Sequence, residues 1–376
     1  MHDVSALSPL PRQLTLYVNY ACHLRCKHCY LYGVADYDHP YMAPMTNSAM
    51  PWDTFRKAVD PMLESGAALS LFLMGGEPCL HERLADMVAY VARHPSTYVD
   101  MNTHGMLLPK KAAGLIAAGI NGIYVSLDGS QASTNDPLRG VGSFDRAIKG
   151  ILAAIAARGA ARTPKVAINA TITNGNVHDL VGMADKAVAL GVDEIFFNLP
   201  VFVTEKEGLA SERAMAARHG IAFSSWRGFR IDPVIDGIDT QVLVSQLEQL
   251  KARKWPLPLF LQPIGYSPRE LATYFTDDWA RTLRQRACPV RDFRATVLPN
   301  GDVTPCTIYP DVVLGNLVGQ TLPEVWTGAA YRRFRQDVGQ RLLPTCRRCC
   351  DLFDETQGDP DAFLNDSRSS AMLSGF

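Results

Sequence analysis

Short apolar runs alternate with longer amphipathic segments through the first half of the chain. The runs that predict strands cover residues 14–19, 68–74, 98–101, 122–127, 166–172 and 194–198. Between them, apolar residues recur with helical spacing at 51–65, 82–93, 109–118, 143–158 and 177–190. The clearest helix ends at Gly159, a typical stop signal. Repeated β–α units of this length predict a parallel sheet with helical crossovers.

The pattern leaves the architecture of this α/β protein open between two forms. Six strands suit a partial barrel and also a doubly wound sheet, because both bury parallel strands. Over residues 204–287, charged helical segments mix with proline-rich pieces. Further on, Asn300-Gly301 between two short apolar runs predicts a hairpin. The polar residues 357–376 predict a mobile tail.

Charge and targeting signals exclude several classes of partner. The chain has 37 basic and 38 acidic residues and a net charge of −1, so no basic surplus favours nucleic acid or an anionic membrane. Residues 1–11 lack a cationic start followed by an apolar run, and no stretch approaches a spanning helix. We therefore expect a cytoplasmic protein that binds neither nucleic acid nor membrane.

A cytoplasmic location changes the interpretation of the nine cysteines. Thiols rarely form disulfides in a reducing compartment, and the odd count also argues against a disulfide framework. The cysteines are clustered instead, which indicates metal binding. The clusters are Cys22, Cys26 and Cys29; Cys288 and Cys306; and Cys346, Cys349 and Cys350, with Cys79 alone.

The first cluster has the spacing C-x₃-C-x₂-C and follows the first strand. Three thiolates on one loop can hold three irons of a cubane cluster and leave the fourth iron open. The alternative is a structural zinc, with His23 or His28 as the fourth ligand. In β/α barrels, the carboxyl ends of the strands carry the active site.

A second motif, Gly75-Gly76-Glu77-Pro78, follows the second strand. Its glycines allow backbone to approach a ligand closely, and Glu77 adds a carboxylate. Together with the triplet, this motif resembles the radical S-adenosylmethionine (radical SAM) superfamily. The resemblance implies a partial (β/α)₆ TIM-like barrel and a [4Fe–4S] cluster on Cys22, Cys26 and Cys29. It also implies bound S-adenosylmethionine, whose amino group Gly75, Gly76 and Glu77 would hold, and whose cleavage yields a 5′-deoxyadenosyl radical that removes a substrate hydrogen.

The resemblance extends to later strand ends, with ordinary turn or capping chemistry as the alternative. Residues expected to contact S-adenosylmethionine are His28, Asn102, Ser126, Arg139 and Asn169. Asp128 is a candidate general base. Cys79 is a candidate hydrogen donor, although a lone cysteine after a turn is commonly just buried.

The C-terminal cysteines form a second expected metal site. Cys288, Cys306, Cys346 and Cys349 are the expected ligands, and Cys350 is the rival for the last place. A Cys₄ set also suits structural zinc. However, residues 297–306, with the later Leu314-Gly315-Asn316-Leu317 and Glu324-Val325-Trp326, resemble the SPASM and twitch extensions. Because no cysteine follows Cys350, the resemblance implies the twitch-type arrangement with one auxiliary [4Fe–4S] cluster.

These expectations divide the chain into a radical SAM barrel (1–203), a helical linker or substrate-binding region (204–287), an auxiliary-cluster domain (288–356) and a tail (357–376). We expect an oxidoreductase-type enzyme that oxidises, rearranges or epimerises a small biosynthetic intermediate, with a flavodoxin- or ferredoxin-type electron donor. The few residues before the first strand argue against a leader-binding domain. The alternatives are a maturase that modifies a ribosomally made peptide and, remotely, a non-catalytic zinc protein.

Overall fold

The computed structural model describes residues 8–34, 48–263, 265–284, 286–288 and 290–351. The predicted tail, 357–376, lies outside the described residues. Strands and helices alternate regularly as far as residue 198. The strands are β1 (Gln13–Asn19), β2 (Leu69–Gly75), β3 (Thr97–Thr103), β4 (Gly122–Ser126), β5 (Lys165–Thr171), β6 (Glu194–Asn198), β7 (Leu259–Gln262), β8 (Arg294–Val297), β9 (Asp302–Thr304) and β10 (Gly315–Asn316).

Helices of very different length connect the strands. The α-helices are α1 (Trp52–Glu64), α2 (Leu84–Ala92), α3 (Leu108–Ala117), α4 (Ala132–Arg139), α5 (Ser143–Arg158), α6 (Leu180–Leu190), α7 (Glu205–His219), α8 (Asp232–Ile235), α9 (Thr240–Ala252), α10 (Pro268–Leu271), α11 (Trp279–Thr282), α12 (Leu322–Trp326) and α13 (Ala329–Gln340). Single 3₁₀ turns are η2 (Pro78–Leu80), η3 (Ser225–Phe229), η4 (Ala272–Phe275) and η5 (Pro344–Cys346).

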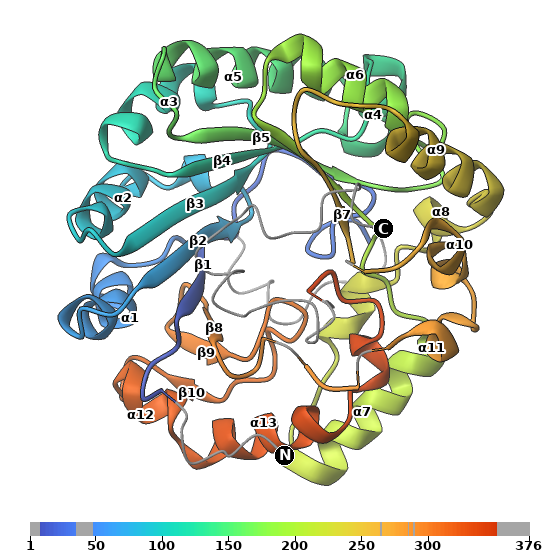
Figure 1. The fold of residues 1–376 in the computed structure, drawn as a ribbon. Coiled ribbons are helices and arrows are strands. Elements are labelled where there is room, and N and C mark those ends of the chain that lie inside the picture. Colours follow the sequence, from blue (N-terminus) through green and yellow to red (C-terminus); the bar gives the residue numbers. More distant parts are fainter. Residues whose placement is uncertain (1–7, 35–47, 264, 285, 289, 352–376) are drawn as a thin grey trace.

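All ten strands belong to one sheet, in the order β10-β9-β8-β1-β2-β3-β4-β5-β6-β7. Strands β1 to β6 pair in parallel in chain order, which confirms the predicted α/β partial barrel. The strands curve around a central space, with α1 to α6 on the outside (Figure 1). The described part of the sheet ends at β7 on one edge and β10 on the other, so the barrel is open.

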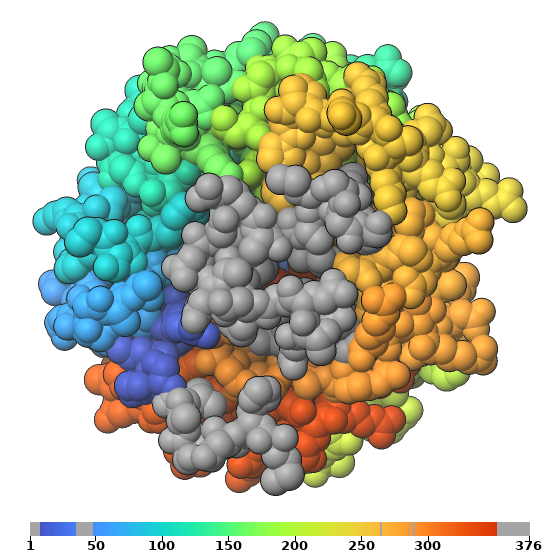
Figure 2. Space-filling view, in the orientation of Figure 1, coloured from blue at the N-terminus to red at the C-terminus, as the bar shows by residue number. Residues whose placement is uncertain are grey.

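The sheet extends beyond the six predicted strands on both sides. Strand β7 pairs in parallel with β6, and β8 pairs in parallel with β1. The predicted hairpin is present as the antiparallel pair β8–β9 around Asn300-Gly301. The blue N-terminal and orange C-terminal segments consequently lie side by side on the surface (Figure 2). The C-terminal cysteines are thereby carried next to the strand that precedes the cysteine triplet.

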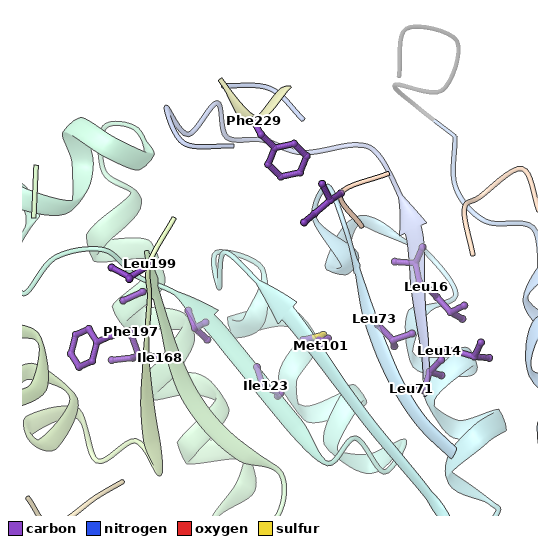
Figure 3. Close-up of a cluster of buried hydrophobic side chains, with 14 of the residues drawn as sticks. Leu14, Leu16, Leu71, Leu73, Met101, Ile123, Ile168, Phe197, Leu199 and Phe229 are labelled. Atoms are coloured by element: carbon purple, nitrogen blue, oxygen red, sulfur yellow. The ribbon is translucent and has the colours of Figure 1, made fainter. Parts of the chain in front are cut away.

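The core lies between the sheet and its covering helices. Leu14 and Leu16 on β1 and Leu71 and Leu73 on β2 are fully buried there (Figure 3). The alternate side chains of the same strands point into the barrel, as the two-residue period of a strand requires. Several of these inward residues are polar, which is typical of a strand face that lines a binding cavity. No helix in the described ranges is both long and apolar enough to cross a membrane.

Candidate active site

One cavity of about 930 Å³ occupies the barrel interior and the space beneath the C-terminal domain. Every cysteine of the chain except Cys79 lines this cavity. The two predicted metal sites therefore face a common space, although they are separated by more than 250 residues of sequence. Gly75, Gly76 and Asn102 line it as well, together with Ser126, Arg139 and Asn169.

The cysteine triplet sits on a compact loop directly after β1. Cys29 N–H donates to the carbonyl of Cys26 at 3.0 Å, which turns the chain between the two thiols. Lys27 N–H donates to Leu138 O at 2.9 Å, so the loop is tied to the end of α4. Burial raises the pKa of Cys22 to about 11 and that of Cys29 to about 12. The thiols of the metal-free loop are thus protonated, and metal binding must release those protons.

Neither predicted thiol set is gathered as closely as a zinc tetrahedron requires in the described part of the chain. Ligands of a zinc tetrahedron with Zn–S bonds of about 2.3 Å bring their sulfurs within about 3.8 Å of one another. Among the described residues, one group brings three potential metal-ligand atoms within 4.8 Å of one another. It consists of Cys349, Cys350 and Asp351. Neither the triplet nor the predicted C-terminal quartet is that tightly gathered. In a cubane, each thiolate binds a different iron and the sulfurs are correspondingly farther apart.

Gly75 and Gly76 bring the end of β2 against the backbone that leads into the cysteine loop. Gly75 has a φ of +129°, and a Cβ there would lie 2.1 Å from the carbonyl oxygen of Asn19. A Cβ at Gly76 would lie 2.2 Å from the carbonyl oxygen of Ala21. Side chains at these positions are excluded by backbone, and the cavity wall is left bare for a ligand. This cradle fits a group that approaches the main chain closely.

The Glu77 side chain is fully buried and does not line the cavity. Its carboxylate accepts hydrogen bonds from the Cys79 amide at 3.0 Å, the Thr103 hydroxyl at 2.6 Å and the His104 amide at 2.9 Å. The carboxylate therefore joins the ends of β2 and β3. Any contact of Glu77 with a ligand in the cavity must come from its backbone.

Asp128, predicted as a base, is fully buried behind the cavity wall. Its carboxylate forms an ion pair with Arg139, whose Nε lies 2.6 Å away, and accepts hydrogen bonds from Arg139 Nη2 at 3.0 Å and from the Thr171 amide at 2.8 Å. His28 Nε2 lies 3.3 Å from the same carboxylate. Burial lowers the pKa of His28 to about 4, so its ring is neutral at pH 7. Asp128 holds two cavity-lining side chains, Arg139 and His28, and does not face the cavity itself.

Cys79 is also placed away from the cavity. Its side chain is buried, and its sulfur lies 3.8 Å from Thr103 Oγ1. Burial raises the pKa of the Cys79 thiol well above its usual value. These contacts are those of a packed core thiol.

The polar residues predicted on β3 and β5 do meet. Asn169 Nδ2 donates to Asn102 Oδ1 at 3.2 Å, and Asn198 Nδ2 on β6 donates to Asn169 Oδ1. The three amides form a row along the cavity wall, and Gln262 on β7 lines the same wall beside Asn198. Sequence reasoning missed Asn198 and Gln262. The placement of Asn198 at the end of a predicted strand was the available signal, whereas Gln262 belongs to a strand that was not predicted.

The C-terminal thiols line the same cavity. The Tyr309 hydroxyl lies 2.8 Å from Cys346 Sγ, and Asp351 Oδ2 lies 3.9 Å from Cys349 Sγ. Arg294 pairs with Asp351 at 2.6 Å. Burial raises the pKa of Cys288 to about 12 and that of Cys346 to about 11. Both Cys349 and Cys350 reach the cavity, so the geometry keeps both as possible fourth ligands.

An open parallel barrel with cysteines at the end of its first strand, and a second thiol set packed against that strand, defines an iron–sulfur protein of the partial-barrel class. Family comparison gives the particular family. Residues 16–187 match the radical SAM superfamily, and residues 288–350 match SPASM, an iron–sulfur cluster-binding domain. The chain belongs to the radical SAM superfamily and carries a C-terminal SPASM/twitch-type domain. Its cofactors are those of the two domains, S-adenosylmethionine and iron–sulfur clusters.

Curated relatives include heme-type synthases and mycofactocin maturases. The chain is 23% identical to the AdoMet-dependent heme synthase of Nitratidesulfovibrio vulgaris over 87% of this chain and 82% of that protein. It is 26% identical to the pre-heme d1 synthase of Dinoroseobacter shibae over 82% of this chain and 71% of that protein. It is 30% identical to the mycofactocin maturase MftC of Mycobacterium tuberculosis, but over only 48% of this chain and 43% of that protein.

Solved structures share the fold at low sequence identity. SuiB of Streptococcus suis, bound to the precursor peptide SuiA, matches with a TM-score of 0.61 and 15% identity, over 98% of this chain and 76% of that chain. The protein anSMEcpe, bound to AdoMet and a peptide, matches with a TM-score of 0.56 and 15% identity, over 96% of this chain and 92% of that chain.

Proposed function

We propose that the protein reductively cleaves S-adenosylmethionine and uses the product to abstract a hydrogen atom from a small biosynthetic intermediate in the cytoplasm. The observation that carries this proposal is the shared cavity, which both cysteine sets and the glycine cradle line. The substrate would then be oxidised, rearranged or epimerised inside this cavity. The radical SAM and SPASM matches support the chemistry.

Each wall of the cavity has a role in this proposal. Cys22, Cys26 and Cys29 hold the first [4Fe–4S] cluster, next to the cradle of Gly75 and Gly76. When bound, that cluster and S-adenosylmethionine supply a 5′-deoxyadenosyl radical. Further contacts to S-adenosylmethionine come from the remaining wall residues predicted for it, namely His28, Asn102, Ser126, Arg139 and Asn169. Glu77, which does not line the cavity, would contribute through its backbone.

The second thiol set completes the redox chemistry. Cys288, Cys306, Cys346 and Cys349, with Cys350 as the rival for the last place, hold one auxiliary [4Fe–4S] cluster. Four protein ligands leave no open iron, so this site suits electron transfer and not substrate binding. Its position on the same cavity suits removal of an electron from the substrate after hydrogen abstraction.

The size and lining of the cavity favour a small molecule. Sites for small molecules and cofactors have volumes of about 300–1,000 Å³, and this cavity is near the upper end while having to hold S-adenosylmethionine as well. Leu199, Val201 and Phe229 form an apolar wall beside the amides of Asn198 and Gln262. The relatives that match most of the chain are also named for the synthesis of heme-type molecules.

A ribosomally made peptide is the second candidate substrate. The 30% identity to the mycofactocin maturase MftC supports it, although that match spans less than half of either chain. Incubation with a synthetic precursor peptide and with small-molecule extracts, each followed by mass spectrometry, separates the two candidates. A mass change in the peptide alone favours the maturase.

The first test compares two single cysteine-to-alanine variants. Cys26→Ala removes a cavity-lining ligand and is expected to abolish 5′-deoxyadenosine formation with dithionite as reductant. Cys79→Ala removes a buried thiol outside the cavity and is expected to retain it. The amount of 5′-deoxyadenosine formed by each variant is measured by liquid chromatography. Unaltered turnover in Cys26→Ala would refute the cluster assignment, and loss of substrate conversion alone in Cys79→Ala would restore Cys79 as a hydrogen donor.

A further inference from the structure

The outer face of the cysteine loop has a charge pattern that cluster binding does not explain. Along the loop, His23, Arg25 and Lys27 are exposed, whereas the intervening Leu24 and Cys26 are buried. The loop thus presents its thiols inward and basic or titratable side chains outward. The whole chain has a net charge of only −1, so this grouping does not follow from a generally basic composition.

The segment after α4 continues this face. Lys27 N–H donates to Leu138 O at 2.9 Å, and a Cβ at Gly140 would lie 3.8 Å from Leu24 Cδ2. The next residue, Val141, is 90% exposed, more than any other large apolar side chain in the described ranges. A single exposed valine is ordinary in itself. Here the Arg146 guanidinium donates to Val141 O at 2.7 Å, so a basic side chain adjoins the exposed valine.

Two carboxylates lie near this face. Asp136 accepts from the Gly142 and Phe144 amides at 2.7 and 2.9 Å, so it is engaged in capping the start of α5. Asp145 is exposed on the first turn of the same helix. On the loop side, the Arg25 guanidinium lies over the Tyr32 ring at 4.4 Å, and among the described residues neither Arg25 nor Lys27 forms an ion pair with a carboxylate.

We propose that this surface, formed by His23, Arg25, Lys27, Val141 and Arg146, is the docking patch for an acidic one-electron carrier protein of the flavodoxin class. The inference rests on the proposed function, which requires the first cluster to be reduced. Arg25 and Lys27 are sequence neighbours of Cys26, so a carrier bound here lies next to the loop that would hold the cluster. The carrier loses one electron and the cluster gains it, and no atom is exchanged.

Complementary charge with a small apolar centre is the pattern of fast, weak protein encounters. Opposite charges steer the partners together and mainly raise the association rate, and redox encounters commonly bury little surface. Such a contact weakens as salt screens the charges. The patch is therefore expected to control the rate of reduction by a protein donor and not the stability of the cluster.

The test compares a protein donor with a small reductant on the reconstituted full-length protein. The variant Lys27→Glu/Arg146→Glu reverses two patch charges and spares Arg25, whose guanidinium donates to Cys22 O and Leu24 O. The matched control is Lys206→Glu/Lys254→Glu, which reverses two exposed charges outside the patch. Stopped-flow bleaching of the cluster absorbance is followed with reduced bacterial flavodoxin and, separately, with dithionite.

With flavodoxin at low ionic strength, the patch variant is expected to be reduced at least about tenfold more slowly than the unaltered protein. The difference should shrink as salt is added, while the control pair and all dithionite rates stay unchanged. Equal slowing in the control pair, or no slowing in the patch variant, would overturn the docking patch alone. A protein in which dithionite bleaches no cluster would overturn the proposed function and the patch together.

Discussion

Asp128 illustrates how one buried carboxylate organises several ligand-facing residues. It follows β4, pairs with Arg139 at the end of α4, accepts from the Thr171 amide at the end of β5, and lies 3.3 Å from His28 on the cysteine loop. Asp128 does not line the cavity, and its Oδ2 lies beside Arg139 Nε and His28 Nε2. We propose that Asp128 positions Arg139 and His28 and takes no proton from the substrate.

Asp128→Asn is expected to lower both stability and S-adenosylmethionine affinity. The exchange leaves a buried guanidinium uncompensated, which typically costs about 3–5 kcal/mol. Denaturant unfolding measures the first effect, and equilibrium dialysis of labelled S-adenosylmethionine the second. Asp86→Asn is the control, because its pair with Arg83 is exposed and contributes little.

A positioning role predicts a specific pattern. Affinity should fall even under conditions where the variant is fully folded and retains its full iron content. Full iron, normal affinity and lost substrate turnover would instead restore Asp128 as the general base.

At the residue scale, the sequence motifs predicted which residues belong to the site better than they predicted what each side chain contacts. The spacing of Cys22, Cys26 and Cys29 predicted a set of thiols that the structure places on one cavity wall. The Gly75-Gly76-Glu77-Pro78 motif could not reveal that the Glu77 carboxylate accepts hydrogen bonds from Thr103 and His104. Those contacts depend on how β2 and β3 end side by side. Side-chain direction at a strand end is a property of tertiary packing.

At the scale of elements, the junction of β1 and β2 is a part of the site where backbone packs closely on backbone. The two strands end together, and the Gly76 amide donates to Asn19 O at 2.9 Å. The missing Cβ at Gly76 leaves room for the carbonyls of Tyr20 and Ala21, immediately before Cys22. The cysteine loop thus starts from backbone that is packed directly on the glycine motif.

Gly76→Ala is expected to displace the start of the cysteine loop. A methyl group would lie 2.2 Å from Ala21 O and 2.4 Å from Tyr20 O, so backbone must move at a cost of about 1–3 kcal/mol. Iron content and S-adenosylmethionine binding should both fall. Gly114→Ala is the control: it lies in α3 with no atom within 4 Å of its Cβ position, and it should gain about 1 kcal/mol of stability. Normal iron binding in Gly76→Ala would show that the loop adapts.

The elements themselves were predicted where local pattern decides structure. The helix over residues 143–158 has the predicted ends, since Gly142 and Gly159 flank it with positive φ. Strand β7 was missed because it has four residues and lies between Pro258 and Pro263, inside a segment predicted to be helical. The parallel pairing of β8 with β1 joins residues about 280 apart, and no local signal encodes such a contact.

At the scale of the whole molecule, that long-range pairing creates the function we propose. Because β8 extends the sheet next to β1, the C-terminal cysteines reach the cavity that the N-terminal triplet lines. Cysteines on an appendage that did not join the sheet would not reach this cavity. The account therefore requires two iron–sulfur clusters that face one space.

The most direct test is the content of iron, sulfide and zinc after anaerobic reconstitution, in the unaltered protein and in a Cys22/Cys26/Cys29→Ala variant. The account predicts about eight irons per chain, falling to about four in the variant, with matching sulfide and no zinc. About four irons in the unaltered protein and none in the variant would contradict the auxiliary cluster. Zinc without iron would contradict the radical mechanism as a whole.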